Sequence, residues 1–237
     1  MANYFLAGLV VDIQNRYCYL ENQCRPFRCE DSLTPDITVR VNREDLEQEM
    51  EKLDRRHSPG YVESICLYRK LCLQMPAFSG LFLHSSVIRT GEQGIAFLAP
   101  SGTGKTTHTV LWQQLLGDKM QVINGDKPIV RFRTEKPEAF GTPWAGKEGL
   151  YQKDSVILTD LCFLEQATEN TCAPLSREEA LQKIVYQVIL PTDLQGAVET
   201  LDLLDRLLRS CRLWKISCNT ELAAAEIAYN TIIKTDL

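Results

Sequence analysis

The sequence has few histidines, no C-x-x-C cysteine pair and no cluster of lysine and arginine. Its 3 histidines lie apart from the one close group of cysteines. No apolar run reaches the length of a membrane-spanning helix, so we expect a soluble protein with no membrane partner. A net charge of -5 without a basic cluster argues against nucleic acid as the main partner, because phosphate backbones require clustered positive charge.

The cysteines lack the pattern of a disulfide framework. There are 9 of them, an odd number, and several, such as Cys66 and Cys162, lie inside apolar periodic segments. Cys18, Cys24 and Cys29 form the one close group, and their spacing matches no familiar zinc pattern, so a metal site there is the disfavoured alternative. No signal peptide is evident. We therefore expect reduced, mostly buried thiols in a cytoplasmic protein.

The composition is that of an ordinary globular protein. Hydrophobic residues make up 44% and charged residues 24% of the 237 residues, which is enough chain to bury a full core. The regular apolar pattern is interrupted at residues 76–80, which we take as a candidate domain boundary. We predict an α/β (α+β) protein with a small N-terminal α+β unit over residues 1–80 and a larger core over residues 81–237.

The stretch from Ala99 to Thr107 has the features of a phosphate cradle. An apolar run at residues 95–98 precedes it, and a helical pattern over residues 105–116 follows it. Gly102 and Gly104 allow the backbone to turn so that its N–H groups surround a phosphate. The match to G-x-x-x-x-G-K-[ST] lacks only the first glycine, which is Ala99 here. The alternative is a glycine-rich turn with an incidental lysine.

Each part of this stretch has a physical role in the phosphate-binding interpretation. The N-terminus of the helix directs its partial positive charge at the phosphates, and Lys105 adds a mobile charge. The Thr106 hydroxyl is placed to bind magnesium, so ATP and Mg²⁺ are the expected cofactors. The predicted nucleotide-binding residues of the loop are Ser101, Gly102, Thr103, Gly104, Lys105, Thr106 and Thr107.

Two later segments add candidate site residues. Asp126 follows a predicted strand, where a magnesium-binding or catalytic carboxylate is expected after a phosphate loop; a simple turn aspartate is the alternative. The polar, glycine-rich loop over residues 141–149 carries Lys147 and Glu148, which we expect to hold a phosphate or the acceptor. Trp144 in the same loop either stacks on a ligand or fills the core. The alternative is a loop that only connects two strands.

Short apolar runs with period-two alternation predict the strands. A hairpin-like turn at residues 90–94, with Gly91 where positive φ is needed, joins two of them. The predicted strands cover residues 4–11, 17–20, 36–41, 81–89, 94–98, 120–123, 128–132, 155–165 and 212–218.

Capping residues and apolar faces predict the helices. Asn42, Ser58 with Pro59, and Ser176 with Glu179 each mark a helix start. The helices are expected to begin after Asn42 and to cover residues 59–75, 105–116, 176–191, 193–208 and 220–233. The core-facing side chains are expected to be Leu46, Met50 and Leu53 in the first helix and Leu201, Leu204 and Leu208 in the helix at 193–208.

The order of these features resembles the kinase core of HPr kinase/phosphorylase and its relatives. The amino-acid sequence of the loop is also similar to that of ATP-dependent phosphoenolpyruvate carboxykinase. The chain as a whole resembles a compact bacterial branch of HPr-kinase-like proteins. The segments that carry the resemblance are FLHSSV at 82–87, SGTGKT at 101–106, NGD at 124–126, GTPW at 141–144, GKE at 146–148, FLEQ at 163–166 and CN at 218–219.

The resemblance implies a P-loop kinase core, with phosphate and magnesium bound by the loop, and Asp126 as the strand-end acid. His84 corresponds to a histidine that faces the site in that family, although by itself it could be a core residue. The implied catalytic residues are Asp126, Lys105 and His84, and the metal ligands are Thr106 and Asp126. HPr-kinase relatives are often oligomers, so a homo-oligomer is also implied.

The expected function is an ATP- and Mg²⁺-dependent kinase that transfers the γ-phosphate to a hydroxyl of a small molecule or peptide. HPr kinases carry two adjacent acids after the second strand, whereas Asp126 stands between Gly125 and Lys127. This lone acid favours an alternative, a nucleotide-binding sensor or partner subunit that transfers no phosphate. The intact Gly-Lys-Thr-Thr sequence favours the enzyme.

Overall fold

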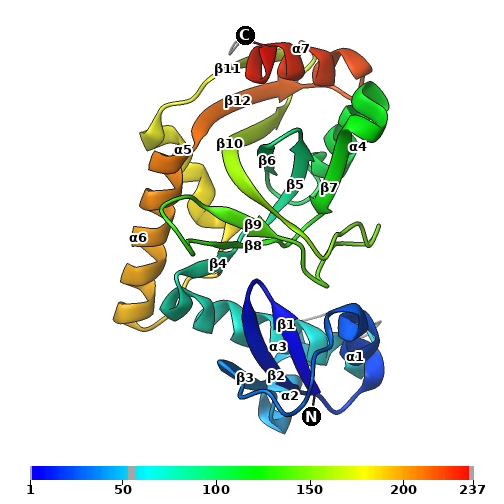
Figure 1. Cartoon of the computed structure of the whole chain (residues 1–237), viewed down its shortest axis with the longest axis vertical. Helices are drawn as coiled ribbons and strands as arrows, with labels where there is room; N and C mark the ends of the chain where they lie inside the picture. Colours follow the sequence, from blue (N-terminus) through cyan, green and yellow to red (C-terminus); the bar gives the residue numbers. More distant parts are fainter. Residues whose placement is uncertain (1, 53–56, 235–237) are drawn as a thin grey trace.

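A computed structural model describes residues 2–52 and 57–234 of the chain. The chain begins with a three-stranded sheet in the order β1-β2-β3, drawn in blue in Figure 1. Strands β1 (Ala2–Leu6) and β2 (Leu9–Gln14) are antiparallel, and β3 (Ile37–Arg40) lies parallel to β2. The predicted run over 4–11 is therefore two strands. They are joined at Ala7 and Gly8, whose φ angles of 50° and 80° make a tight hairpin turn.

Three helices pack on this small sheet, and one of them was predicted incorrectly. The expected strand at 17–20 is the start of α1 (Cys18–Cys24), which buries Leu20 and Cys24 one helical turn apart. Helices α2 (Arg43–Lys52) and α3 (Pro59–Gln74) begin where predicted. Met50 was expected to be buried but is 46% exposed, whereas Leu46 is buried; Leu53 lies outside the described residues.

The caps of α2 and α3 explain why these helices start where they do. Asn42 Oδ1 accepts from the Asp45 backbone N–H at 2.8 Å, and Asp45 Oδ2 accepts from the Asn42 N–H at 2.9 Å. Ser58 Oγ accepts from the Tyr61 N–H at 3.3 Å. Each bond satisfies a backbone donor that the first helical turn leaves without a partner.

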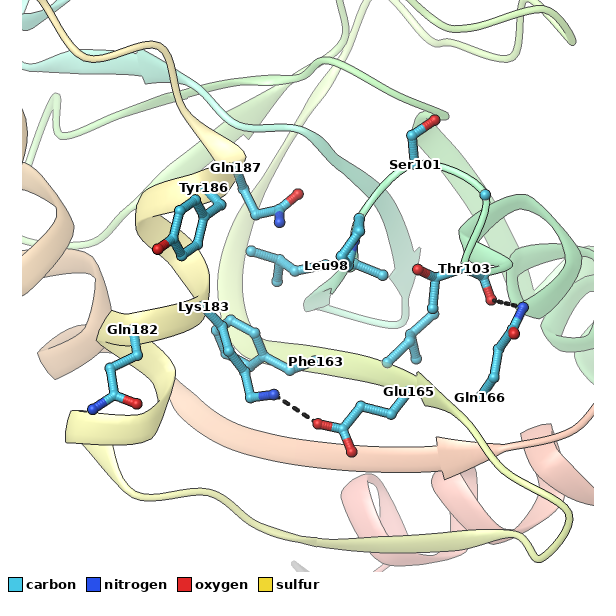
Figure 2. Close-up of a pocket in the computed structure, with 14 residues that line it drawn as sticks. Leu98, Ser101, Thr103, Phe163, Glu165, Gln166, Gln182, Lys183, Tyr186 and Gln187 are labelled. Carbon is cyan, nitrogen blue, oxygen red and sulfur yellow. Dashed lines mark hydrogen bonds and ion pairs between the residues drawn. The ribbon is translucent and has the colours of Figure 1, made fainter.

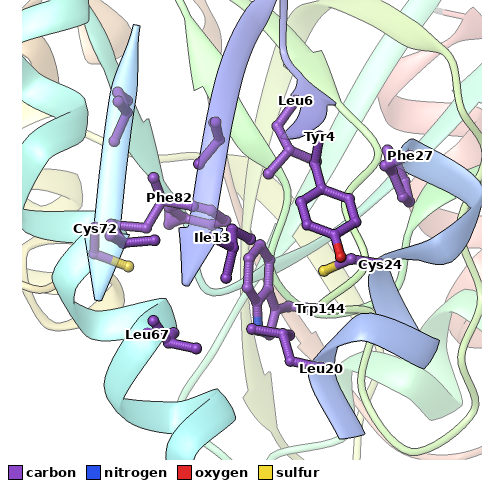
Figure 3. Close-up of a cluster of buried hydrophobic side chains, with 14 of the residues drawn as sticks. Tyr4, Leu6, Ile13, Leu20, Cys24, Phe27, Leu67, Cys72, Phe82 and Trp144 are labelled. Carbon is purple, nitrogen blue, oxygen red and sulfur yellow. The ribbon is translucent and has the colours of Figure 1, made fainter. Parts of the chain in front are cut away.

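The core of the N-terminal unit continues into the rest of the protein. Figure 3 shows Tyr4, Ile13 and Leu67 of this unit in one cluster with Phe82 and Trp144, which come from later segments. The Trp144 and Phe82 rings meet edge to face, 5.5 Å apart. The division at residue 80 stays a prediction, and the hydrophobic packing is continuous across it.

The larger sheet is mixed, with the order β4-β8-β9-β10-β6-β5-β7, and β12 and then β11 extend it from β10. Strand β10 is long, so its first residues pair with β9 and its later residues lie between β6 and β12. The strands are β4 (Gly80–Phe82), β5 (Ser85–Thr90), β6 (Gln93–Leu98), β7 (Met120–Asn124), β8 (Ile129–Arg131), β9 (Glu138–Phe140), β10 (Ser155–Gln166), β11 (Thr171–Pro174) and β12 (Arg212–Cys218).

Helices cover both faces of this sheet (Figure 1). In β6, Ile95 and Phe97 pack with α4 (Lys105–Leu116) and α7 (Leu222–Ile232), whereas Ala96 and Leu98 pack with α5 (Arg177–Ile184) and α6 (Leu194–Ser210). Successive side chains of a strand point to opposite faces of the sheet. Because helices cover both faces of β6, all of its residues from 95 to 98 are apolar. The protein is thus a mixed α/β protein, as predicted.

Several boundaries differ from the sequence prediction. The run at 81–89 is two strands, β4 and β5, because the chain passes from one part of the sheet to another at Leu83 and His84. The helix expected to reach residue 191 ends at Ile184 and continues only as the 3₁₀ turn η4 (Val185–Gln187). Leu201 was expected in the core but is 44% exposed, while Leu204 and Leu208 are buried.

All nine cysteines are free thiols, and only Cys18 is fully exposed. Burial raises the pKa of the Cys66 thiol to about 11, so this group stays protonated and inert at neutral pH. Over residues 2–52 and 57–234, no helix is both long and apolar enough to cross a membrane.

Candidate active site

Three loops of the large sheet meet at one edge. Strands β6 and β10 are parallel, and β5 is antiparallel to both β6 and β7, so β7 runs in the same direction as β6. The carboxyl ends of β6, β7 and β10 therefore lie together, which is where ligands bind in open α/β sheets. The loop after β6 carries Ser101 to Gly104, the loop after β7 carries Asp126, and β10 ends at Glu165 and Gln166.

The loop after β6 has the backbone of an anion cradle. Gly102 and Gly104 have φ angles of 82° and 116°, which side-chain-bearing residues rarely adopt. A Cβ atom at either position would meet no other atom within 4 Å, so the space above the loop is open. Gly104 caps α4 without a side-chain hydrogen bond, and the N–H groups of Gly102, Gly104 and Lys105 have no acceptor among the described residues. These donors are available to an anion.

Lys105 begins α4 and bends back over the loop. Its Nζ atom donates to the Ala99 carbonyl oxygen at 2.8 Å. Burial lowers the pKa of Lys105, and the negative charge of Asp126 acts in the opposite direction. The two side chains are therefore close enough to interact electrostatically. Of the other predicted loop residues, Thr103 and Thr106 are half-buried, whereas Ser101 and Thr107 are exposed.

Asp126 is held by two basic side chains. Its Oδ1 atom lies 3.2 Å from His84 Nε2, and its Oδ2 atom lies 3.2 Å from Lys127 Nζ. Burial alone raises the pKa of the Asp126 carboxyl, but the hydrogen bonds and charges of His84 and Lys127 together outweigh burial and hold that pKa below its usual range. The structure thus brings together three predicted site residues, His84, Lys105 and Asp126, and keeps the carboxylate ionised.

Two buried polar residues, Asn124 and Thr142, fix the turn that carries Asp126, and no such role was predicted for either of them from the sequence. Asn124 Oδ1 accepts from the N–H groups of Asp126 at 2.9 Å and Lys127 at 2.7 Å. Asn124 Nδ2 donates to the carbonyl and hydroxyl oxygens of Thr142, both at 3.1 Å. An asparagine that bonds the backbone two residues later is a common turn device, so the Asn-Gly-Asp sequence itself contained the signal.

The loop over residues 141–149 wraps around this turn. The Trp144 carbonyl accepts from the Lys127 N–H at 3.1 Å. A Cβ atom at Gly146 would lie 3.2 Å from Asp126 Cβ and 3.6 Å from Glu148 Oε2. Glu148 therefore lies on the Asp126 side of the loop; Lys147 and Glu148 are both exposed. Trp144 is buried against Tyr68 and Phe82, so of its two predicted roles the structure supports filling the core.

A cavity of about 700 Å³ opens beside the first half of the loop. Figure 2 shows its walls, formed by Leu98 and the loop on one side and by α5 and η4 on the other, with the end of β10 between them. Gln166 Nε2 donates to the Thr103 carbonyl at 3.2 Å, which ties the end of β10 to the loop. The volume is typical of sites for small molecules.

Gln187 connects this cavity to the catalytic candidates. The residue lines the cavity, is buried, and its carbonyl accepts from the His84 N–H at 2.7 Å. The Gln187 amide satisfies its neighbours when its nitrogen is assigned to the position that faces Ala99 and His84. In that orientation the side chain donates to the Ala99 carbonyl at 3.1 Å and to His84 Nδ1 at 3.2 Å. This assignment leaves the His84 proton on Nε2, directed at Asp126. No sequence motif marked Gln187, since its partners lie far away in the chain.

The residues at this edge fit magnesium better than a metal bound by protein side chains alone. Within the described part of the chain, no group of three or more His, Cys, Asp or Glu side chains could hold a metal ion. Mg²⁺ commonly takes one or two protein oxygens and completes its shell with phosphates and water. The Thr106 hydroxyl and the ionised Asp126 carboxylate are oxygen donors of that kind.

Comparisons with solved structures give a distant similarity of fold. No family model matches the chain, and no curated protein matches its sequence. A similar solved structure is that of the Hpr(Ser) kinase/phosphatase from Coxiella burnetii, with 10% sequence identity and a TM-score of 0.35. The similarity covers 65% of this chain and 92% of that chain. It is a distant relationship of fold and carries no argument about activity.

Proposed function

We propose that the chain is an ATP- and Mg²⁺-dependent phosphotransferase with a P-loop kinase core, acting on a hydroxyl group. The loop after β6 binds the phosphates through the N–H groups of Gly102, Gly104 and Lys105. The positive end of α4 and the Lys105 ammonium group add electrostatic attraction. The open space above both glycines supports this assignment, because the phosphates must approach the backbone closely.

The observation that carries the proposal is the ionised Asp126 carboxylate at the same sheet edge as the loop. In the proposed reaction, Asp126 takes the proton of the acceptor hydroxyl as its oxygen attacks the γ-phosphorus. The new bond joins the acceptor oxygen to phosphorus, the bond to the β,γ-bridging oxygen breaks, and ADP leaves. Lys105 offsets the negative charge on the phosphates during transfer.

His84 and Gln187 position the base. His84 donates from Nε2 to Asp126, and Gln187 holds the histidine in this orientation from the other side. Lys147 and Glu148 lie on the loop beside Asp126 and are proposed to contact the phosphates or the acceptor. Thr106 and Asp126 would hold Mg²⁺, which offsets phosphate charge when bound.

A second candidate function is a nucleotide-binding module that transfers no phosphate. The observation in its favour is that both oxygens of Asp126 already have basic partners, His84 and Lys127. Such a module would bind ATP through Lys105 and the loop but would need no general base.

Acceptor-dependent transfer separates the two functions. Labelled γ-phosphate from ATP and Mg²⁺ is offered to panels of hydroxylated metabolites and peptides with wild type, Lys105→Ala and Asp126→Asn. A phosphotransferase labels an acceptor, and both variants lose at least about a hundredfold in rate. ATP binding without labelling of any acceptor supports the binding module instead.

A further inference from the structure

The cavity beside the loop contains charged groups that the proposed mechanism does not use. Its base is apolar, formed by Leu98, Phe163 and Leu164, and its rim carries Glu165 and Lys183 (Figure 2). Lys183 Nζ lies 2.6 Å from Glu165 Oε1. A concave site with an apolar base and a few polar groups is the usual form of a small-molecule site.

Glu165 has two lysine partners, and only one of them faces the cavity. Lys215 of β12 lies 2.9 Å from Glu165 Oε2 and is not among the residues that line the cavity. Hydrogen bonds from Lys183 and Lys215 lower the pKa of Glu165, so this carboxyl is charged at neutral pH. If Lys183 moves to another anion, Lys215 still compensates Glu165. The ammonium group of Lys183 can therefore bind a ligand at small cost.

The other carboxylate near these lysines is already engaged. Glu179 Oε2 accepts from the Ser176 hydroxyl at 2.6 Å and from the Ser176 N–H at 3.3 Å, as part of the capping box that starts α5. Glu179 is exposed and is not among the residues that line the cavity. Lys183 is thus the basic side chain of the described cavity lining.

The cavity adjoins the loop that is proposed to bind the phosphates, because Ser101, Gly102 and Thr103 form part of its lining. Gln187 forms part of its wall and contacts His84, which in turn contacts Asp126. A molecule in the cavity therefore lies one side chain away from the histidine that positions the proposed base. A position beside both the loop and Gln187 suits the phosphate acceptor, because the acceptor hydroxyl must lie close to the phosphate that is transferred.

We propose that this cavity binds the acceptor, and that the acceptor is a small hydroxylated carboxylic acid whose carboxylate binds Lys183. The inference rests on the proposed phosphotransferase function and adds its substrate class. The apolar base of the cavity accommodates the body of the molecule, and Gln182 and Tyr186 border the opening on the side of α5 and η4.

Matched ligand pairs test the carboxylate requirement directly. The probes are 4-hydroxyphenylacetate with 4-hydroxyphenylacetamide, and N-acetyl-L-serine with N-acetyl-L-serinamide, titrated by NMR into wild type, Lys183→Gln and Lys215→Gln. Lys215→Gln is the matched control, because Lys215 pairs with the same carboxylate but does not line the cavity. Thermal melting of all three proteins checks that the exposed substitutions leave the fold intact.

We expect wild type to bind at least one acid about tenfold more tightly than its amide. Lys183→Gln removes this preference, and Lys215→Gln keeps it. In transfer assays with that acid, Lys183→Gln raises KM about tenfold and leaves kcat within about twofold, which corresponds to about 1.4 kcal/mol of binding. The inference is overturned if neither acid binds, or if acids and amides bind equally.

The outcomes also distinguish this inference from the proposed function. Acid binding that depends on Lys183 without any phosphate transfer preserves the carboxylate site and removes the kinase proposal. Efficient transfer to uncharged acceptors, unaffected by Lys183→Gln, preserves the kinase and overturns the carboxylate site.

Discussion

The Nε2 atom of His84 lies 3.2 Å from the Oδ1 atom of Asp126, so the residue before β5 and the second residue after β7 form one pair. Ser85, the next residue after His84, donates its N–H to the Asp126 carbonyl at 3.0 Å. The pair is thus fixed by backbone as well as side-chain contacts. It sets the ionisation of the carboxylate on which the proposed chemistry depends.

Replacing His84 shifts the pH dependence of the reaction. In wild type the pKa of Asp126 is below its usual range, so transfer retains its base until the pH falls below that range. In His84→Leu only Lys127 still opposes the effect of burial, so the pKa of Asp126 rises and the acid limb of the rate profile moves to higher pH.

A ¹³C NMR titration of the Asp126 carboxyl measures the same shift without relying on turnover. His57→Leu is the control, since His57 is exposed and stacks on Tyr61 in the N-terminal unit. Equal acid limbs and equal carboxyl titrations in wild type and His84→Leu would contradict this account of the pair.

Asn124→Ala is expected to destabilise the protein and to displace Asp126. The substitution leaves the Asp126 N–H without its acceptor and the Lys127 N–H with the Trp144 carbonyl alone, at a cost of about 1 to 3 kcal/mol. Urea denaturation measures the change in the free energy of unfolding. Asn230→Ala, at an exposed position of α7, should change it by no more than about 0.5 kcal/mol. Similar effects of both variants would show that Asn124 does not hold the turn.

His108 is expected to make the fold sensitive to acid. Burial lowers its pKa from 6.5 to about 4, and its Nε2 atom accepts from Trp112 Nε1 at 3.0 Å. Because the folded state binds this proton less readily than the unfolded state, the contribution is present above about pH 6.5 and is lost as the pH falls toward about 4. The loss amounts to at most about 3 kcal/mol.

The His108→Gln variant isolates that contribution, because a glutamine oxygen can still accept from Trp112. The free energy of unfolding of the variant should decline less between about pH 7 and pH 4 than that of wild type. If the free energies of unfolding of wild type and His108→Gln fall equally with pH, His108 is not the cause of the acid sensitivity and carboxylates elsewhere are.

Local signals in the sequence predicted the elements that hold the loop. The Gly-Lys boundary at residues 104 and 105 marks the start of α4, and the structure places the helix at Lys105–Leu116, as expected. Asp126 after β7 was predicted from its position at a strand end. These features depend on residues close together in the chain, such as glycines that need positive φ and apolar residues with a fixed period.

Features that depend on distant packing were not predicted. The segment from Tyr17 to Leu20 has strand-like composition, but burial of Leu20 and Cys24 on one side makes it helical. Leu201 has the spacing of a core leucine, yet α6 directs Leu204 and Leu208 inward instead. Gln187 reaches His84 only because η4 returns the chain to the start of β5, a contact that no local pattern contains.

The most direct test of the central claim is the affinity for ATP with Mg²⁺, measured by calorimetry for wild type, Lys105→Ala and Lys119→Ala. Lys119 is exposed beyond the other end of α4 and serves as the matched control. We expect Lys105→Ala to weaken ATP binding at least about tenfold and Lys119→Ala to bind ATP as wild type does. No ATP binding by wild type, or equal affinity in Lys105→Ala, would contradict the claim that this loop binds nucleotide phosphates.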